Sequence, residues 1–205
     1  MTHLRCTLGL FAVLAAATSC AKNGGERGSG AVDAPNWRAR VVKASAAFPA
    51  TPLAACTQPA TTYLLLSGVS VNSLQGAPPN ALPALTFCKR TFGDDDAFFS
   101  YRASDKLAWQ TKKVESATRI VLFKPTKEVA PKAGGSPGQI GTLTPGVIDG
   151  RAVVFSVEGV PECEVPVHAE GPERASSNRS QNIDTVVRED LCRLAGAAVA
   201  KALQR

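Results

Sequence analysis

The sequence predicts an α+β fold in which a mainly antiparallel sheet is packed by a long C-terminal helix and by one or two shorter N-terminal helices. Three observations predict it. Residues 162–168, ECEVPVH, alternate as a half-buried strand does. Residues 182–203 carry an apolar stripe at helical spacing. An even set of cysteines beyond residue 20 predicts two disulfides, and its members are Cys56, Cys88, Cys163 and Cys192.

The first residues of the chain predict a secretory signal. Arg5 precedes an apolar run over residues 6–17, which is shorter than the roughly 20 residues that a membrane-spanning helix needs, and small residues follow it. Residues 17–20, ATSC, resemble a bacterial lipobox. This resemblance implies that residues 1–19 are a signal peptide, that Cys20 is lipidated, and that the protein is held on the extracytoplasmic face of the cell membrane. Plain secretion with cleavage nearby and an uncleaved anchor are the alternatives.

The rest of the chain has the composition of one exported domain on a tether. Residues 20–36 are rich in glycine and polar side chains, which predicts a lipidated flexible tether. Residues 37–205 have the length of a single α+β domain. The formal net charge of +6 is compatible with attraction to an anionic membrane or cell-wall polymer, and equally with no functional role. Because no run of five or more basic residues occurs, no nucleic-acid partner is expected.

The cysteines allow three disulfide connectivities. We expect Cys56 to pair with Cys88 and Cys163 to pair with Cys192, because the members of each pair lie in the same half of the chain. A sheet-facing helix would also bring Cys192 towards the inward face of the strand that carries Cys163. No structural zinc site is expected, since the sequence has no C-x-x-C pair and His168 is its one histidine after residue 20. No other metal and no cofactor is indicated.

The N-terminal half predicts short helices and strands. Residues 37–48 have helical spacing and stop at a proline. Residues 62–71 fit either a buried strand or a short helix. Two strand-like runs on either side of the polar residues 93–96 predict a hairpin over residues 85–103. Residues 105–116 allow a short helix.

The C-terminal half predicts more strands. Residues 119–124, RIVLFK, read as a strand that ends before Pro125, with a loop from there to residue 139. Asp149 and Gly150 stand between two apolar runs, which is a strong turn signal.

The strand over residues 162–168 and the final helix have the clearest periodicity. On the strand, Cys163, Val165 and Val167 share one face, and Glu162, Glu164 and His168 share the other. On the helix, the expected inward stripe consists of Ile183, Val187, Leu191, Leu194, Ala198 and Ala202.

Several residues are of types that occur in catalytic or cation-binding sites. His168 lies opposite the core face of its strand, so we interpret it as a surface residue. Asp94, Asp95 and Asp96 offer carboxylates to a cation such as calcium, but they lack the spacing of a calcium loop and favour a solvated turn. Residues 68–72, GVSVN, miss the last glycine of a serine elbow. The sequence therefore predicts no catalytic residue.

A family resemblance rests on the order of several motifs: the lipobox, the glycine-rich tether, FCKR, GRAVVF, CEVPV and the terminal LCRLAGAAVAKAL. In this order the chain resembles a family of actinobacterial exported lipoproteins of unknown function, over about residues 50–205. The resemblance implies a small α+β domain with four cysteines in similar places. A more distant likeness is to the extracellular sensor domains of mycobacterial kinases. Neither likeness implies a reaction.

Two functions of different classes follow as hypotheses. The first is a membrane-anchored envelope lipoprotein that acts without catalysis, as a binding or sensor module for a small apolar or amphipathic ligand or for an envelope partner protein. The second is an envelope hydrolase with an unrecognised site. The first is favoured because the chain is poor in catalytic residue types.

Overall fold

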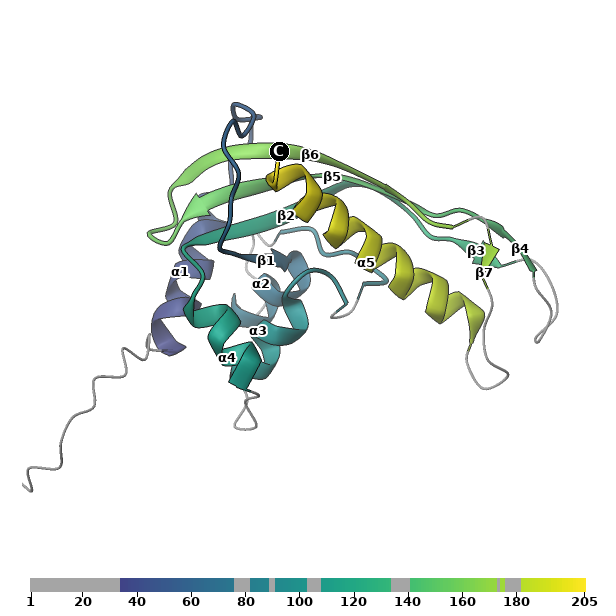
Figure 1. The fold of residues 1–205 in the computed structure, drawn as a ribbon, viewed down its shortest axis with the longest axis horizontal. Helices are drawn as coiled ribbons and strands as arrows, with labels where there is room; N and C mark the ends of the chain where they lie inside the picture. Colours follow the sequence, from purple (N-terminus) through teal and green to yellow (C-terminus); the bar gives the residue numbers. More distant parts are fainter. Residues whose placement is uncertain are drawn as a thin grey trace, which may run out of the picture. The chain divides into compact units, whose positions relative to one another are not determined.

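The structure is a computed structural model that describes residues 34–75, 82–88, 91–102, 108–133, 141–172, 174–175 and 182–205 (Figure 1). The predicted signal peptide, the lipidation residue Cys20 and the predicted tether up to residue 33 lie outside these ranges. All the described residues belong to one unit, Ala31–Arg205.

The described residues form an α+β fold, as predicted, with short helices before the main run of strands and one long helix after it. The elements are α1 (Ala34–Ala46), β1 (Tyr63–Ser67), α2 (Gly68–Gln75), α3 (Asp95–Arg102), α4 (Ala108–Glu115), β2 (Arg119–Val129), β3 (Lys132–Ala133), β4 (Gly141–Thr144), β5 (Val147–Ser156), β6 (Pro161–Glu170), β7 (Arg174–Ala175) and α5 (Ile183–Leu203).

The main sheet has four strands in the order β1-β2-β5-β6. β1 runs parallel to β2, whereas β2 with β5 and β5 with β6 are antiparallel. Parallel neighbours need a crossover connection, and α2, α3 and α4 lie in the chain between β1 and β2. The sheet is therefore mixed, with antiparallel pairs in the majority. The short strands β3, β4 and β7 form a separate three-stranded sheet.

Both faces of the main sheet carry apolar side chains, because successive residues of a strand point to opposite sides. Figure 1 shows α5 lying along the sheet beneath β5 and β6, with the shorter helices gathered near β1. The cluster on the α5 face includes Leu65, Val121, Val154, Val165, Leu191 and Val199. The cluster on the other face includes Trp37, Val41, Leu64, Ile120, Phe98 and Phe155. The sheet thus separates two apolar cores.

Six elements match the sequence analysis. α1 and α4 lie where helices were predicted, and the run at residues 62–71 contains both alternatives in succession, with β1 followed by α2. On β6 the alternation is confirmed: Val165 and Val167 are buried in the α5 core, whereas Pro166 and His168 are exposed. The last of them, α5, begins at Ile183, and the side chain of Asn182 caps it by accepting a hydrogen bond from the Asp184 N–H at 2.9 Å.

The inward stripe of α5 differs in part from the predicted one. Val187 and Leu191 are buried as expected, but Leu194 is 44% exposed. The remaining buried positions are Cys192, Ala195, Gly196, Val199 and Leu203. The buried face is therefore displaced by about one residue from the predicted one, with Ala195 in place of Leu194 and Val199 in place of Ala198. Among the described helices, α5 included, none is long and apolar enough to cross a bilayer.

The predicted hairpin around residues 93–96 is wrong. Residues 82–88 contain no strand, and α3 begins at Asp95. Gly93 turns the chain with a φ of 53°, a backbone conformation that favours glycine. The carboxylates of Asp94 and Asp95 then accept hydrogen bonds from backbone N–H groups of β1. These bonds hold the segment against β1 and start a helix there, so it does not fold back as a second strand.

The turn predicted at Asp149 and Gly150 is also wrong, because β5 runs straight through both residues. β2 likewise continues past Pro125, opposite Gly150, where the pairing with β5 shifts register. Such an irregularity accommodates a residue without an N–H. A Cβ on Gly150 would lie 2.5 Å from Cζ of Phe123. The glycine is therefore explained by the space that the Phe123 ring occupies.

The four cysteines form two disulfides, as predicted, but the predicted pairing is wrong. Cys56 is bonded to Cys163, and Cys88 is bonded to Cys192. The two bridges are interleaved along the chain. Cys192 and Cys163 do both face the core beneath the sheet, but a shared face does not place two residues at the same point along it.

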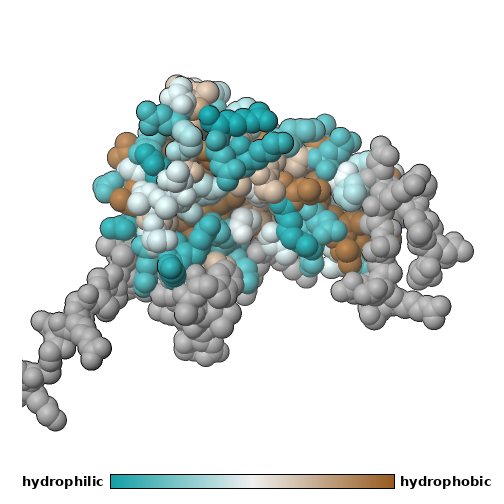
Figure 2. All heavy atoms as spheres, viewed as in Figure 1, coloured by the Kyte–Doolittle hydropathy of each residue, from teal (hydrophilic) through white to brown (hydrophobic). Residues whose placement is uncertain are grey.

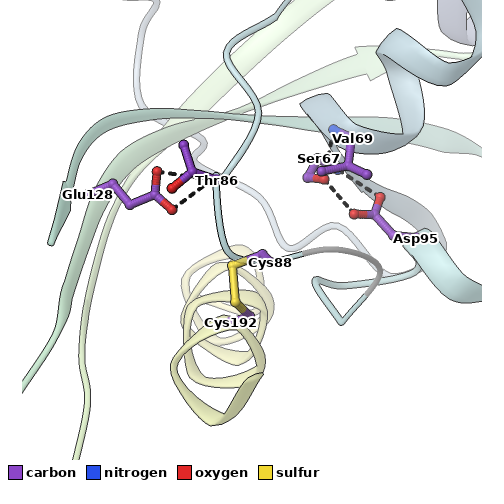
Figure 3. The surroundings of a disulfide bond; sticks show 7 residues. All are labelled: Ser67, Val69, Thr86, Cys88, Asp95, Glu128 and Cys192. Atoms are coloured by element: carbon purple, nitrogen blue, oxygen red, sulfur yellow. Dashed lines mark hydrogen bonds between the residues drawn. A yellow bond between two sulfur atoms is a disulfide. The ribbon is translucent and has the colours of Figure 1, made fainter. Parts of the chain in front are cut away.

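Two segments without regular structure bring the observed partners together. Residues 49–60, which we call the strap, run beside the edge strand β6: the Cys56 N–H donates to the Glu164 carbonyl at 3.2 Å, and the Glu164 N–H donates to the Ala54 carbonyl at 3.1 Å. Residues 82–88 pass over α5, and the Thr86 N–H donates to the Glu128 carboxylate at 2.8 Å (Figure 3). Neither segment has a periodic pattern of apolar residues, so the sequence analysis could not predict where they lie.

Removing the buried bridge should lower the stability of the domain. Cys88 and Cys192 are fully buried, so the variant Cys88→Ala/Cys192→Ala loses both the cross-link and core contacts. We expect a loss of about 2–5 kcal/mol in the free energy of unfolding, measured by chemical denaturation under oxidising conditions. Peptide mapping of the unmodified protein without reduction should recover Cys56 linked to Cys163 and Cys88 linked to Cys192. Recovery of Cys56 linked to Cys88 would contradict the connectivity.

Candidate functional site

The β1 edge of the main sheet is bonded to the turn that precedes α3. The Leu65 N–H donates to Oδ2 of Asp94 at 2.9 Å, and the Asp94 N–H donates to the Leu65 carbonyl at 2.8 Å. The Asp94 turn thus takes the place of a neighbouring strand at this point. Its position brings the carboxylate of Asp94, which is mostly buried, next to the groove described below.

Asp95 is a fully buried carboxylate that joins three elements. It accepts hydrogen bonds from the Ser67 N–H at 3.0 Å, from the Ser67 hydroxyl at 2.5 Å and from the Ser70 hydroxyl at 2.6 Å. Figure 3 shows its side chain directed at Ser67. Burial raises its pKa to about 6, while the three hydrogen bonds oppose that rise. The expectation of a solvated turn is therefore wrong for Asp95, although its neighbour Asp96 is exposed.

The other candidates from the sequence do not assemble into a catalytic or metal site. Ser70 lies after a strand and at the start of a helix, as a nucleophilic serine in a serine elbow would. It is fully buried, however, and its hydroxyl donates a hydrogen bond to Asp95. His168 is on the surface, as predicted, with its side chain 66% exposed and Nδ1 2.6 Å from Oδ1 of Asp149. The described residues contain no group of three or more side chains that could hold a metal ion.

A groove lies between the end of α5, the start of β1 and the end of α4. It consists of two hollows that share Tyr63 and Lys113 in their walls. The first, of about 420 Å³, is lined by Pro59, Ala60, Thr61, Thr62, Tyr63, Lys113, Ser116 and Gln204. The second, of about 260 Å³, is lined by Tyr63, Leu65, Thr91, Gly93, Asp94, Lys113, Arg193, Gly196, Ala197 and Ala200. We call these the strap hollow and the charged hollow.

The side chains at the junction of the two hollows interact with one another. Nζ of Lys113 lies 3.4 Å from Oδ1 of Asp94 and 5.9 Å from the centre of the Tyr63 ring. Burial, and to a smaller extent the charge of Asp94, raise the pKa of the Tyr63 hydroxyl. Tyr63 is therefore a neutral phenol at physiological pH and can donate a hydrogen bond.

The charged hollow depends on glycine at two points. The close approach of α5 to the turn before α3 leaves a Cβ on Gly196 only 3.0 Å from the Gly93 nitrogen. Gly93 itself has a positive φ. The buried hydroxyl Oγ1 of Thr91, in the same wall, has no hydrogen-bond partner among the residues that the structure describes.

A further hollow of about 380 Å³ lies around the outer disulfide. Strap residues 54–60 form one wall, and the opposite wall includes Arg119, Glu162 and Cys163. Nε of Arg119 lies 2.8 Å from Oε2 of Glu162, so the two charges on this wall compensate each other. This hollow shares Pro59 and Ala60 with the strap hollow, and the strap therefore contributes to both.

Sequence reasoning did not find the groove. Tyr63, Thr91, Lys113 and Arg193 come from four separate segments. Arg193 stands in the terminal LCRLAGAAVAKAL, but that motif assigned it no role. Only the fold brings them together. The one sequence feature that pointed to this region was the aspartate cluster, which was interpreted as a turn.

The comparisons with known proteins are negative: no protein-family model, no curated protein and no solved structure matches the chain.

Replacing Asp95 by asparagine should flatten the pH dependence of stability. The folded-state pKa of Asp95, about 6, is above its ordinary value of 3.8. Its contribution to stability is therefore full below pH 3.8 and is lost as the pH rises to about 6 and beyond, a loss of about 3 kcal/mol. Asp95→Asn cannot ionise and should not show this loss.

Urea denaturation at pH 4 and at pH 7 measures the effect. The stability of Asp95→Asn relative to the unmodified protein should be higher at pH 7 than at pH 4. Asp96→Asn is the matched control, because Asp96 is the exposed neighbour in the same turn of α3. If the two variants show the same pH dependence of stability, Asp95 is not the group whose ionisation causes it.

Proposed function

We propose that the chain is a membrane-anchored envelope lipoprotein, held through Cys20, that binds a small amphipathic ligand in the groove and catalyses no reaction. The observation that carries the binding proposal is the meeting of two hollows at Tyr63 and Lys113. Ligand sites are concave, mainly apolar, and contain a few polar groups that fix orientation. The groove is concave, and its lining combines apolar and polar side chains in comparable parts.

The walls of the groove support an amphipathic ligand. Apolar surface comes from Pro59 and Ala60 in the strap and from Ala197 and Ala200 in α5. Polar groups include the amide of Gln204. A ligand with an apolar part and a polar head would bury the first against the alanines and pair the second with the side chains at the junction.

The disulfides support an extracytoplasmic location. Structural disulfides persist in oxidising compartments and are rare in the cytosol. The signal and lipobox predicted from residues 1–20 supply the route to that location and the attachment. The location and the lipid attachment are tested together by recovering the mature protein from membranes and determining its first residue and its mass. Both measurements should show acylated Cys20.

A small ligand is better supported than a large apolar docking face. The exposed large apolar side chains of the described residues lie apart in the chain: Val129 ends β2, Val160 lies in the connection between β5 and β6, and Leu194 is on α5. Figure 2 shows hydrophilic side chains interspersed with hydrophobic ones over the face in view. A hydrolase has less support, because Ser70 is buried with its hydroxyl bonded to Asp95, whereas His168 is exposed beside Asp149.

Native mass spectrometry of the full-length protein, solubilised from its membrane, tests the binding proposal. We expect a co-purifying small molecule that is released on denaturation. Gln204→Trp should fill the strap hollow and lower the bound fraction by about tenfold. Lys201→Trp should leave it unchanged, because Lys201 is exposed in the last turn of α5, close to Gln204 in the chain, but does not line the groove. Equal occupancy in the two variants would contradict ligand binding at this site.

A further inference from the structure

The charged hollow contains more hydrogen-bond donors than acceptors. Lys113 and Arg193 contribute an ammonium and a guanidinium, with side chains 46% and 63% exposed. The one carboxylate in its wall, Asp94, is 17% exposed. Its Oδ2 is already occupied by the Leu65 N–H. The lining therefore carries a net charge of +1, with its cations more accessible than its anion.

Lys113 and Arg193 each have more N–H donors than their ion pairs use. An ammonium has three donors and a guanidinium five. Lys113 contacts Asp94 at 3.4 Å, and Nη2 of Arg193 contacts Oδ1 of Asp190 at 2.9 Å. Asp190 does not line the hollow. These ion pairs orient the two side chains and leave further N–H groups for another acceptor.

Two neutral hydroxyls add to the donors. Oγ1 of Thr91 is buried and lacks a hydrogen-bond partner among the described residues. Thr91 belongs to the lining of the charged hollow, so this hydroxyl is a donor beside the site without an acceptor among the described residues. Tyr63, whose pKa is raised, keeps its proton and is a second donor. What the site lacks is an acceptor with several lone pairs.

We propose that the charged hollow binds the anionic head, a carboxylate or a phosphate, of the amphipathic ligand proposed for the groove. This inference rests on the proposed binding function and adds the charge of the ligand to it. Hydrogen bonds between a charged donor and an anionic oxygen are about twice as strong as neutral ones. The head is held by Lys113 and Arg193, with Thr91 and Tyr63 as neutral donors.

The test uses three probes with the same apolar chain: octanoate, octyl phosphate and 1-octanol. Affinity is measured by titration of the full-length protein followed by NMR, which reads the backbone amides of Gly93 and Gly196 in the charged hollow. We expect the anionic probes to bind about tenfold more tightly than 1-octanol, the equivalent of one charge-assisted hydrogen bond. The difference should shrink as salt is added. The two anionic probes distinguish a carboxylate site from a phosphate site.

Matched variants identify the groups responsible. Lys113→Met and Arg193→Met should each weaken the anionic probes by about tenfold and leave 1-octanol unchanged. Lys112→Met and Arg188→Met are their controls, because both residues are exposed on the same helices and line neither hollow. Thr91→Val, which keeps the shape of the side chain, should weaken the anionic probes by several-fold. Thermal denaturation confirms that each variant is folded.

The outcomes separate the two proposals. If 1-octanol binds as tightly as the anionic probes and the methionine variants change nothing, the anionic head is refuted while ligand binding in the groove stands. If no probe shifts the groove amides and no molecule co-purifies with the protein, both proposals fail.

Discussion

The domain depends on a central strand that is buried on both faces. Residues 120–123 of β2 are fully buried in succession, because even positions face one core and odd positions face the other. Such a strand needs a layer of helix on each side. α5 supplies one layer from the end of the chain, and the N-terminal half supplies the other. The sheet therefore forms only when both ends of the domain have come together, which explains why its order does not follow the order of the chain.

The groove is a consequence of where these layers stop. β1 is an edge strand, and the Asp94 turn bonds to its backbone at Leu65. This turn blocks the addition of another strand there, which edge strands otherwise invite. It also leaves a space that side chains from β1, α4 and α5 surround. Asp95, one residue further along, fixes the turn from inside. One short acidic segment thus protects the sheet edge and forms a wall of the candidate site.

The sequence predicted the elements in which a repeating pattern meets one core. The alternation of β6 and the helical spacing of α5 were sufficient to predict those two elements. Together with the other patterns they were also sufficient to predict the fold class. Three other features depend on contacts between distant segments and were missed. Gly150 resembles a turn residue until the ring of Phe123 is seen beside it. Asp95 resembles a solvated turn residue until Ser67 and Ser70 are seen to enclose it. The pairing of Cys56 is set by an irregular strap, which has no periodic pattern to read.

The interleaved disulfides constrain how the protein is made. A ribosome releases the chain from its amino end, so Cys56 and Cys88 are both exposed as thiols well before either of their native partners, Cys163 and Cys192, has been synthesised. The first bridge that oxidation can form is therefore the wrong one, between two residues of the same half. Correct maturation requires either that oxidation waits for the last helix or that a thiol–disulfide isomerase exchanges the early bond. The abundance of the protein in its host would then follow the activity of that isomerase.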